Sequence, residues 1–263
     1  MHTVMATSLH QSPIYGPVNS RRLGLSLGIN LMPADGKYCT FDCIYCECGS
    51  NSERHTISPR PTRSEIVRAL GNKLCGMSSE GVLPDVLTFA GNGEPTAHPD
   101  FSGIIADTIA LRNRLCPKAR IAVLSNATMI TRKDVFDALM TVDDNILKLD
   151  TADAIYINKV CRPAVPLTDT YGLISRMAEF GGHVTIQTMF MKGQVDGFDV
   201  DNTTEGYVSQ WLEALKVIKP EKVMIYTIDR DTPVASLKKA DRYILENIRR
   251  RAEALGMECI AGY

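Results

Sequence analysis

The 263-residue chain lacks long apolar runs and any strong net charge. No apolar run approaches the roughly 20 residues that a membrane-spanning helix needs. Residues 1–16 have no continuous apolar core of the kind found in signal peptides. The net charge is −1, so we expect no general electrostatic attraction to nucleic acid or anionic lipid. These absences predict a cytoplasmic protein with no membrane partner.

A glycine-rich dinucleotide motif is also missing, because no Gly-x-Gly-x-x-Gly follows the first strand-like stretch. This absence argues against a dinucleotide-dependent oxidoreductase. Cysteine, by contrast, is plentiful: the chain has eight, and four of them fall within residues 39–48. In a reducing cytoplasm, clustered cysteines are more often metal ligands or catalytic groups than disulfides.

Strand-like and helix-like stretches alternate along the chain and predict an α/β fold. Six short runs rich in Val, Ile and Leu predict strands at 25–31, 86–90, 121–124, 146–149, 183–190 and 222–228. Helical periodicity predicts helices near 62–74, 101–115, 131–139, 167–180, 205–218 and 237–255. Six βα units of this kind imply a parallel sheet with right-handed crossovers. We expect a partial (β/α)6 barrel with a curved parallel sheet, formed by one domain over residues 1–263, with residues 1–20 as an N-terminal extension.

Polar residues follow the expected strands, at the ends where α/β folds place their chemistry. The cysteine segment follows the first strand, and Gly91-Asn92-Gly93-Glu94-Pro95 follows the second. Further along the chain, the strands deliver Ser125, Asn126, Asp150, Gln187 and the segment 227–230. Each of these polar groups alone is compatible with an ordinary turn, but polar groups after all six strands, at the same edge of the sheet, favour a functional site.

The cysteine motif Cys39-x3-Cys43-x2-Cys46 offers three thiolates on one short loop. A structural zinc site needs four ligands, and Cys48 is a poor fourth because a Cys-x-Cys step leaves little backbone to wrap a tetrahedron. A 4Fe–4S cubane held by three cysteines leaves one iron open for a substrate or cofactor. The spacing therefore favours iron–sulfur, with zinc and a redox thiol site as alternatives.

This motif, with Tyr45 before the third cysteine, resembles the radical S-adenosylmethionine (radical SAM) superfamily over nearly the whole chain. The resemblance implies a 4Fe–4S cluster on Cys39, Cys43 and Cys46, with S-adenosylmethionine (SAM) chelating the open iron. It also implies reductive cleavage of SAM to a 5′-deoxyadenosyl radical that abstracts hydrogen from a substrate. Cys48 then acts as a bystander or a tuning group.

The resemblance extends to the residues that would bind SAM. The turn at residues 91–95 is similar to the family's GGEP turn, which holds the methionine ammonium, with Asn92 in place of the first paired glycine. By the same resemblance, Tyr45 would lie near the adenine. The residues expected to contact SAM are Tyr45, Asn92, Gly93, Glu94, Ser125, Asn126, Asp150 and Gln187.

Within the superfamily, the stretch GPVNSRRLGLSLGINL that begins at Gly16, with GNGEPT, KLD and YTIDR, is similar to the tRNA wyosine-synthesis enzymes and their bacterial relatives of unknown substrate. Those wyosine enzymes carry a second cluster upstream of the radical motif, whereas residues 1–38 here contain no cysteine. We therefore carry over the radical machinery and not the substrate.

The substrate is left open by the sequence. Arg162, Asp229 and Arg230 are the candidates for substrate contact, because arginine binds carboxylate or phosphate bidentately. An RNA base or small molecule is one expectation, and a glycyl-radical-enzyme activase or a peptide-modifying enzyme is the alternative. The family implies a reducing electron donor such as flavodoxin or ferredoxin, and a macromolecular substrate is a further expectation. In another class, the chain would be a zinc-stabilised, non-catalytic α/β binding protein.

Overall fold

The computed structural model describes residues 9–20, 23–52 and 56–263, so part of the expected N-terminal extension lies outside the described residues. Eight strands form one sheet in the order β1-β2-β3-β4-β5-β6-β10-β12. Their bounds are β1 (Ile14–Ser20), β2 (Gly24–Ile29), β3 (Val86–Phe89), β4 (Arg120–Ser125), β5 (Asp144–Lys148), β6 (Thr185–Met189), β10 (Lys222–Tyr226) and β12 (Glu258–Gly262). β1 pairs antiparallel with β2, and every other neighbouring pair is parallel.

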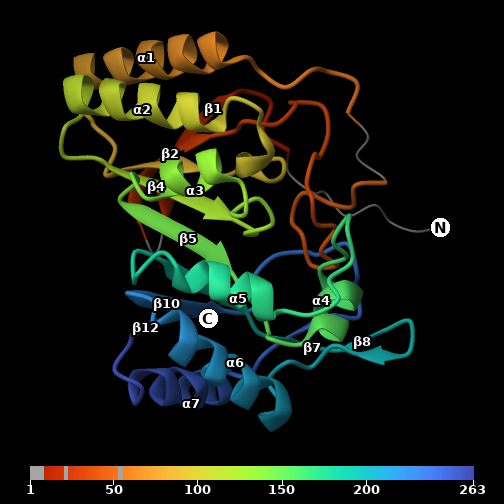
Figure 1. Ribbon diagram of the computed structural model, residues 1–263. Helices are drawn as coiled ribbons and strands as arrows, with labels where there is room; N and C mark the ends of the chain where they lie inside the picture. The colour runs from red at the N-terminus through yellow and green to blue at the C-terminus, as the bar shows by residue number, and fades with distance from the viewer. Residues whose placement is uncertain (1–8, 21–22, 53–55) are drawn as a thin grey trace.

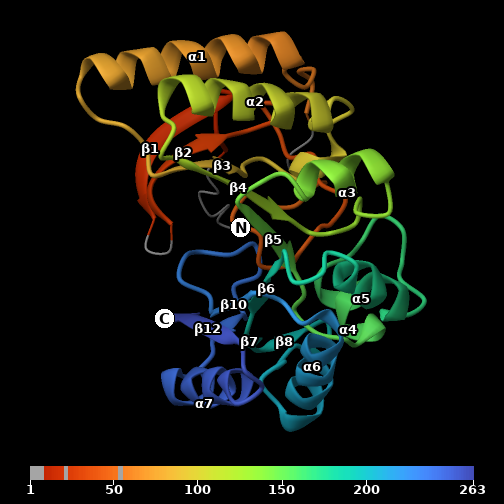
Figure 2. The same ribbon diagram turned by 60° about the vertical axis from the view of Figure 1, so that its left-hand side comes forward.

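The sheet curls into an open half-barrel with helices on its outer side (Figures 1 and 2). Helices α1 and α2 lie near one end of the curl, and α6 and α7 lie near the other. The helices are α1 (Arg63–Ser79), α2 (Phe101–Leu115), α3 (Lys133–Leu139), α4 (Ala154–Val160), α5 (Tyr171–Ala178), α6 (Glu205–Ile218) and α7 (Arg242–Glu253). No helix in the described part of the chain combines the length and apolar character needed to cross a membrane.

The expected partial barrel is confirmed, and each of the six expected strands is present. The sheet is wider than expected, because β1 and β12 extend it by one strand at each edge. Both strands carry weak sequence signals: β1 contains Gly16-Pro17, which only an edge strand tolerates well, and β12 is the short run ECIAG. The final residues are therefore part of the sheet, not a bare tail after the last helix.

The helices agree with the sequence except around residues 150–180 and at the start of α7. Thr62 caps α1 as expected, with the reciprocal Thr62 and Glu65 bonds of a capping box. The segment 154–160 forms the unexpected helix α4, whose first turn Asp153 caps. The helix expected from residue 237 begins at Arg242, because the preceding residues form β11 (Lys238–Lys239) against β7 (Met191–Lys192). A second small ribbon joins β8 (Gln194–Val195) to β9 (Phe198–Asp199).

Side chains of the parallel strands alternate between a packed outer face and an open inner face. Outward residues such as Leu27, Leu87, Ile121, Ile186 and Val223 form the main core with the helices. The inward residues line a cavity inside the half-barrel, and each parallel strand contributes at least one of them, such as Ser26, Thr88, Leu124, Ile146, Gln187, Met224 and Ile260. The curl therefore buries one face of the sheet in packing and leaves the other for a ligand.

Candidate active site

The cysteine loop follows β2 and is fixed to the end of α4. Cys39, Cys43 and Cys46 are half-buried. The amide of Asp42 donates to the carbonyl of Cys161 at 2.9 Å, and the amide of Ile44 donates to that of Val160 at 3.0 Å. A local turn from the Cys46 amide to the Cys43 carbonyl, at 3.1 Å, sets the spacing of the second and third thiols. Helix α4 thus supports the loop.

The thiols differ in acidity in ways that suit metal binding, because the thiolate is the ligand form. A hydrogen bond with Cys161 lowers the pKa of Cys43. A hydrogen bond with Cys48 lowers the pKa of Cys46 to about 6. Burial raises the pKa of Cys39, but its sulfur accepts bonds from the Phe41 amide at 3.4 Å and the Asn126 amide side chain at 3.6 Å. Such donors are those found around iron–sulfur thiolates.

The arrangement bears on which metal group fits. Among residues 9–20, 23–52 and 56–263, no three His, Cys, Asp or Glu side chains gather closely enough to bind one metal ion. A structural zinc needs four such groups around a single point, whereas the cysteines of a cubane each bind a different iron. The three-cysteine loop fits a cubane, and the described residues offer no preformed zinc site.

A buried lysine, Lys37, precedes the three thiols. Its Nζ lies 3.1 Å from an Asp42 carboxylate oxygen and donates to the Gly49 carbonyl at 2.7 Å. Burial works against its charge, but Cys46, Cys39 and Asp42 raise the pKa of Lys37 overall. As a cation, Lys37 therefore links Asp42, inside the cysteine loop, to Gly49 after it. No sequence motif indicated this role for Lys37.

The turn at residues 91–95 is joined to the cysteine loop by backbone contact. Tyr38 and Gly93 form a parallel bridge, with the Tyr38 amide donating to the Asn92 carbonyl at 2.9 Å. Gly93 has φ of 151°, and a Cβ there would lie 1.7 Å from the Tyr38 carbonyl oxygen. Glycine is therefore required for this approach, and the two segments predicted to share a site do meet.

Asn92 faces away from the cavity, which accounts for an asparagine in the turn. Its side chain is fully buried. Its Oδ1 accepts from the His10 amide at 2.8 Å, and its Nδ2 donates to the carbonyls of His10 and Pro33 at 2.9 and 2.8 Å. Its side chain thus anchors the segment before β1, and only its backbone faces the cysteine loop.

Replacing Asn92 with alanine is expected to lower the free energy of unfolding by about 2 kcal/mol, because it leaves buried backbone groups unpaired. Hydrogen exchange of residues 9–20 should become faster in the same variant. Asn72 is exposed on α1, so Asn72→Ala serves as the control with neither effect. Unchanged exchange over residues 9–20 in Asn92→Ala would show that these bonds do not anchor the segment.

Glu94 is buried and saturated by hydrogen bonds from the chain. Its Oε1 accepts from the Thr96 amide and hydroxyl at 3.0 and 2.6 Å and from the Ser125 hydroxyl at 2.8 Å. Its Oε2 accepts from the Asn126 amide at 2.7 Å. Burial raises the pKa of Glu94, although these bonds oppose the shift. The carboxylate therefore joins the end of β3 to the end of β4, and the residues predicted there are brought together.

Asp150 and Tyr45 meet in a network behind the cysteine loop. The Tyr45 hydroxyl donates to the Asp150 carboxylate, and Lys148 Nζ lies 2.9 Å from both that carboxylate and the Cys161 sulfur. Burial would lower the pKa of Lys148, but the Asp150 carboxylate and the nearby thiols raise it well above its usual value. No role was expected for Cys161, or for Lys148 although it lies in the KLD stretch, because their contact with each other forms only in the folded chain.

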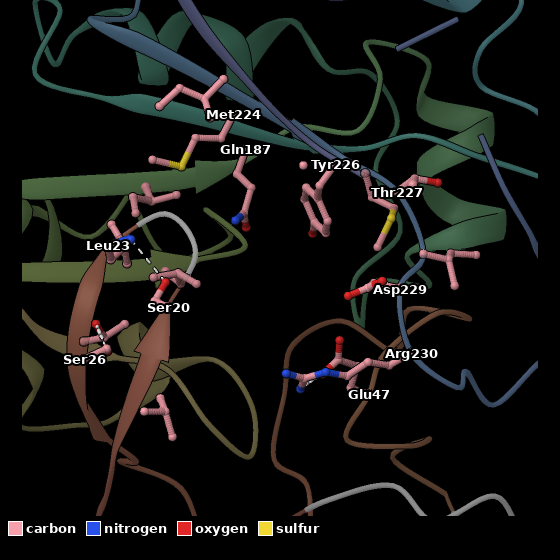
Figure 3. A pocket seen from close by; sticks show the side chains of 18 of the residues that line it. Ser20, Leu23, Ser26, Glu47, Gln187, Met224, Tyr226, Thr227, Asp229 and Arg230 are labelled. Atoms are coloured by element: carbon pink, nitrogen blue, oxygen red, sulfur yellow. Dashed lines mark hydrogen bonds and ion pairs between the residues drawn. The ribbon is translucent and has the colours of Figure 1, made fainter. Parts of the chain in front are cut away.

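The cavity inside the half-barrel has a volume of about 680 Å³ (Figure 3). Tyr45, Gln187, Asp229 and Arg230 line it, and the Gln187 amide projects from β6 into the space. Arg162 does not line the cavity; its guanidinium lies 3.8 Å from the Asp196 carboxylate, near the turn between β8 and β9. The structure therefore brings two of the three expected substrate contacts to the cavity.

Two aromatic residues before β2 also line the cavity and were missed from the sequence. The rings of His10 and Tyr15 stack with centroids 3.5 Å apart. A Cβ at Gly28 would lie within 2.1 Å of the Tyr15 ring, so a glycine in β2 makes room for it. Burial and the Cys48 thiol raise the pKa of Tyr15 to about 12. This segment therefore forms part of the cavity wall.

Comparison with known proteins identifies relatives of similar sequence. The UPF0026 protein MJ1312 of Methanocaldococcus jannaschii is 31% identical over 218 residues, which cover 81% of this chain and 62% of that protein. The UPF0026 protein slr1464 of Synechocystis sp. is 29% identical over 268 residues, which cover 90% of this chain and 91% of that protein. The chain thus spans less than two thirds of the length of the first relative.

Solved structures share the fold at low sequence identity. A radical SAM methyltransferase from Sphaerobacter thermophilus matches 90% of this chain and 66% of its own, with a TM-score of 0.66 and 13% identity. A structure of TYW1 with a lysine-pyruvate adduct matches 87% of this chain and 73% of its own, with a TM-score of 0.57 and 12% identity. The family model of the radical SAM superfamily matches residues 35–201, which hold the three-cysteine loop, the turn at 91–95 and the ends of β4 to β6. This match covers more than half of the chain and shows that the chain belongs to the radical SAM superfamily, whose enzymes use a 4Fe–4S cluster and SAM as cofactors.

Proposed function

We propose that the chain generates a 5′-deoxyadenosyl radical at the cysteine loop and directs it at a substrate in the half-barrel cavity. One observation carries the proposal: the three-cysteine loop and the turn at residues 91–95 are locked together, and the cavity that opens beside them is lined by Tyr45 and Glu47 of that loop. When bound, a 4Fe–4S cluster supplies a low-potential electron that cleaves a C–S bond of SAM and gives the radical that abstracts hydrogen.

The side chains of this chain divide the remaining work. Cys39, Cys43 and Cys46 hold three irons. The backbone of residues 91–93 binds the methionine ammonium of SAM, while the buried Glu94 carboxylate orders that turn from behind. Asn126 donates to the Cys39 sulfur and also to the Thr40 hydroxyl, at 2.8 Å. Donors to a cluster sulfur raise its reduction potential, so Asn126 eases reduction.

The remaining predicted SAM contacts form two pairs, of which one lines the cavity. Tyr45 and Gln187 face the cavity and are placed to meet the adenosine part of SAM. Ser125 and Asp150 are engaged by Glu94 and Lys148 respectively. We propose that these two hold the ends of β4 and β5 in position. The cavity then keeps water away from the radical on the side closed by the sheet.

The substrate class is proposed as an RNA base or a small molecule. A cavity of about 680 Å³ within the half-barrel supports entry of a small ligand or an extruded base, since ligand pockets of roughly 300–1,000 Å³ are typical. The likeness to TYW1 at 12% identity concerns the fold alone, so it does not favour the RNA base over the small molecule. A low-potential flavodoxin or ferredoxin is the proposed electron donor.

Anaerobic turnover tests the function. Protein reconstituted with iron and sulfide should be brown, with absorbance near about 400 nm from thiolate-to-iron charge transfer. With dithionite and SAM it should form 5′-deoxyadenosine. Deuterated candidate substrates should then transfer deuterium into that product. A fully loaded and reduced protein that forms no 5′-deoxyadenosine would rule out the proposal, and a colourless protein with one bound zinc would favour a binding protein.

A further inference from the structure

The part of the cavity wall that the strands form is uncharged. Its strand residues carry hydroxyl, amide, thioether and aliphatic groups, and the hydroxyls of Ser26 and Thr88 bond to each other at 2.8 Å. Gln187 presents a neutral amide, and Met224 lies next to it on β10 (Figure 3). An unpaired charge against such a wall is strongly unfavourable. The part of a ligand that lies along the strands is therefore uncharged.

Charge is concentrated at the end of the cavity nearest the cysteine loop. Among the described residues that line it, the acidic and basic side chains are Glu47, Asp229, Arg230 and His10, and burial lowers the pKa of His10, which favours its neutral form. Asp229 pairs with Lys239 at 3.2 Å. Arg230 pairs with Glu47 at 2.7 Å, and both side chains remain more than half exposed. Arg230 is thus the one guanidinium or ammonium among these described lining residues.

An incoming anion can readily replace Glu47 as the ion-pair partner of Arg230. Glu47 lies between Cys46 and Cys48, and Arg230 follows β10, so the pair joins the cysteine loop to the segment after β10 (Figure 3). An ion pair this exposed contributes little to stability. Arginine binds carboxylate and phosphate in a bidentate manner. An anion entering the cavity therefore competes with Glu47 for a guanidinium already held in place.

We propose that the cavity binds a substrate with an uncharged body and one anionic group, and that Arg230 binds this group in place of Glu47. The anion is a carboxylate or a phosphate, since both match the guanidinium. The inference rests on the proposed function, because it takes the cavity as the substrate site. It assigns the anion to the substrate and not to the carboxylate of SAM.

Binding of small probes to the cluster-loaded protein with saturating SAM, under anaerobic conditions, tests this inference. Phenyl phosphate and phenylacetate carry an uncharged ring and one anionic group, and benzyl alcohol is the neutral counterpart. Arg230→Gln should weaken the tighter-binding anionic probe about tenfold. Glu47→Gln should strengthen it about two- to fivefold by removing the competing carboxylate. Comparison of the two anionic probes distinguishes phosphate from carboxylate recognition.

The controls separate Arg230 from general effects. Arg132→Gln breaks another surface pair, with Asp134, outside the cavity, and should leave all three affinities unchanged. Benzyl alcohol affinity and SAM affinity should be the same in Arg230→Gln as in the native protein.

Four results would overturn the inference: native protein that prefers neither anionic probe to benzyl alcohol, an unchanged Arg230→Gln variant, a Glu47→Gln variant that binds the anion more weakly, or an equal loss of SAM affinity in Arg230→Gln. The last would assign Arg230 to the cofactor carboxylate. Formation of 5′-deoxyadenosine, measured in the same native samples, decides the proposed function separately from these probe affinities.

Discussion

Single replacement of Cys39, Cys43 or Cys46 by alanine is expected to abolish iron and sulfide binding and, with it, formation of 5′-deoxyadenosine. Each thiol binds a different iron of a cubane, so the remaining two cannot hold the cluster in place. The loop offers no obvious substitute: Cys48 donates its S–H to the Gly91 carbonyl at 3.3 Å. Anaerobic reconstitution followed by iron and sulfide analysis measures the loss, with absorbance near about 400 nm as a second readout.

Two other cysteines serve as matched controls for these variants. Cys75 is exposed on α1, so Cys75→Ala should keep native iron and sulfide content. Cys48→Ala should also keep the cluster, because the Cys48 thiol acts on the neighbouring Cys46 and on Gly91 and does not bind iron. Loss of metal in Cys48→Ala would revive a four-thiol site of the zinc type, and full cluster content in any of the three motif variants would disprove the assignment.

The fold was predictable wherever the apolar residues follow the pattern of one element, a short run for a strand or helical spacing for a helix. The six inner strands and most helices have that pattern, because both the sheet and the helices bury a face in the main core. The two edge strands escaped detection, since β1 contains Gly16-Pro17 and β12 (ECIAG) has only one β-branched residue, Ile260. Their place in the sheet is decided by pairing with strands distant in sequence, and local propensity does not encode that pairing.

The candidate site was predictable where chemistry and spacing coincide along the chain. The three cysteines and the turn at 91–95 belong to this class, and the topology brings them together at the end of the half-barrel. The partners of each side chain were not predictable: Asn92 accepts from the backbone amide of His10, and Glu94 accepts from the Ser125 hydroxyl. Lys148 at the end of β5 and Cys161 at the end of α4 meet only in the folded chain, so the sequence holds no signal of their contact.

Alanine at Gly93 is expected to cost roughly 2–5 kcal/mol of folding free energy, with loss of SAM binding in whatever protein remains folded. The added Cβ would lie 1.7 Å from the carbonyl oxygen of Tyr38 and 2.4 Å from its carbonyl carbon. Both atoms belong to the backbone, so no rotamer change relieves the clash. The cysteine loop must therefore move away from the turn at residues 91–95, and the backbone contact between Tyr38 and Gly93 is lost.

A glycine elsewhere in the chain separates this clash from ordinary backbone strain. Gly181 has φ of 61°, and a Cβ there would meet nothing within 4 Å. Gly181→Ala should therefore lower the free energy of unfolding only by the cost of the left-handed backbone conformation, about 1 kcal/mol. Chemical denaturation gives the two stabilities, and titration of the reconstituted proteins with SAM gives the affinities. If Gly93→Ala loses no more stability than Gly181→Ala and binds SAM normally, the contact between the cysteine loop and the turn is not what builds the SAM site. A large loss confined to Gly93→Ala follows directly from two backbones in contact, because at that distance only a hydrogen atom fits between them.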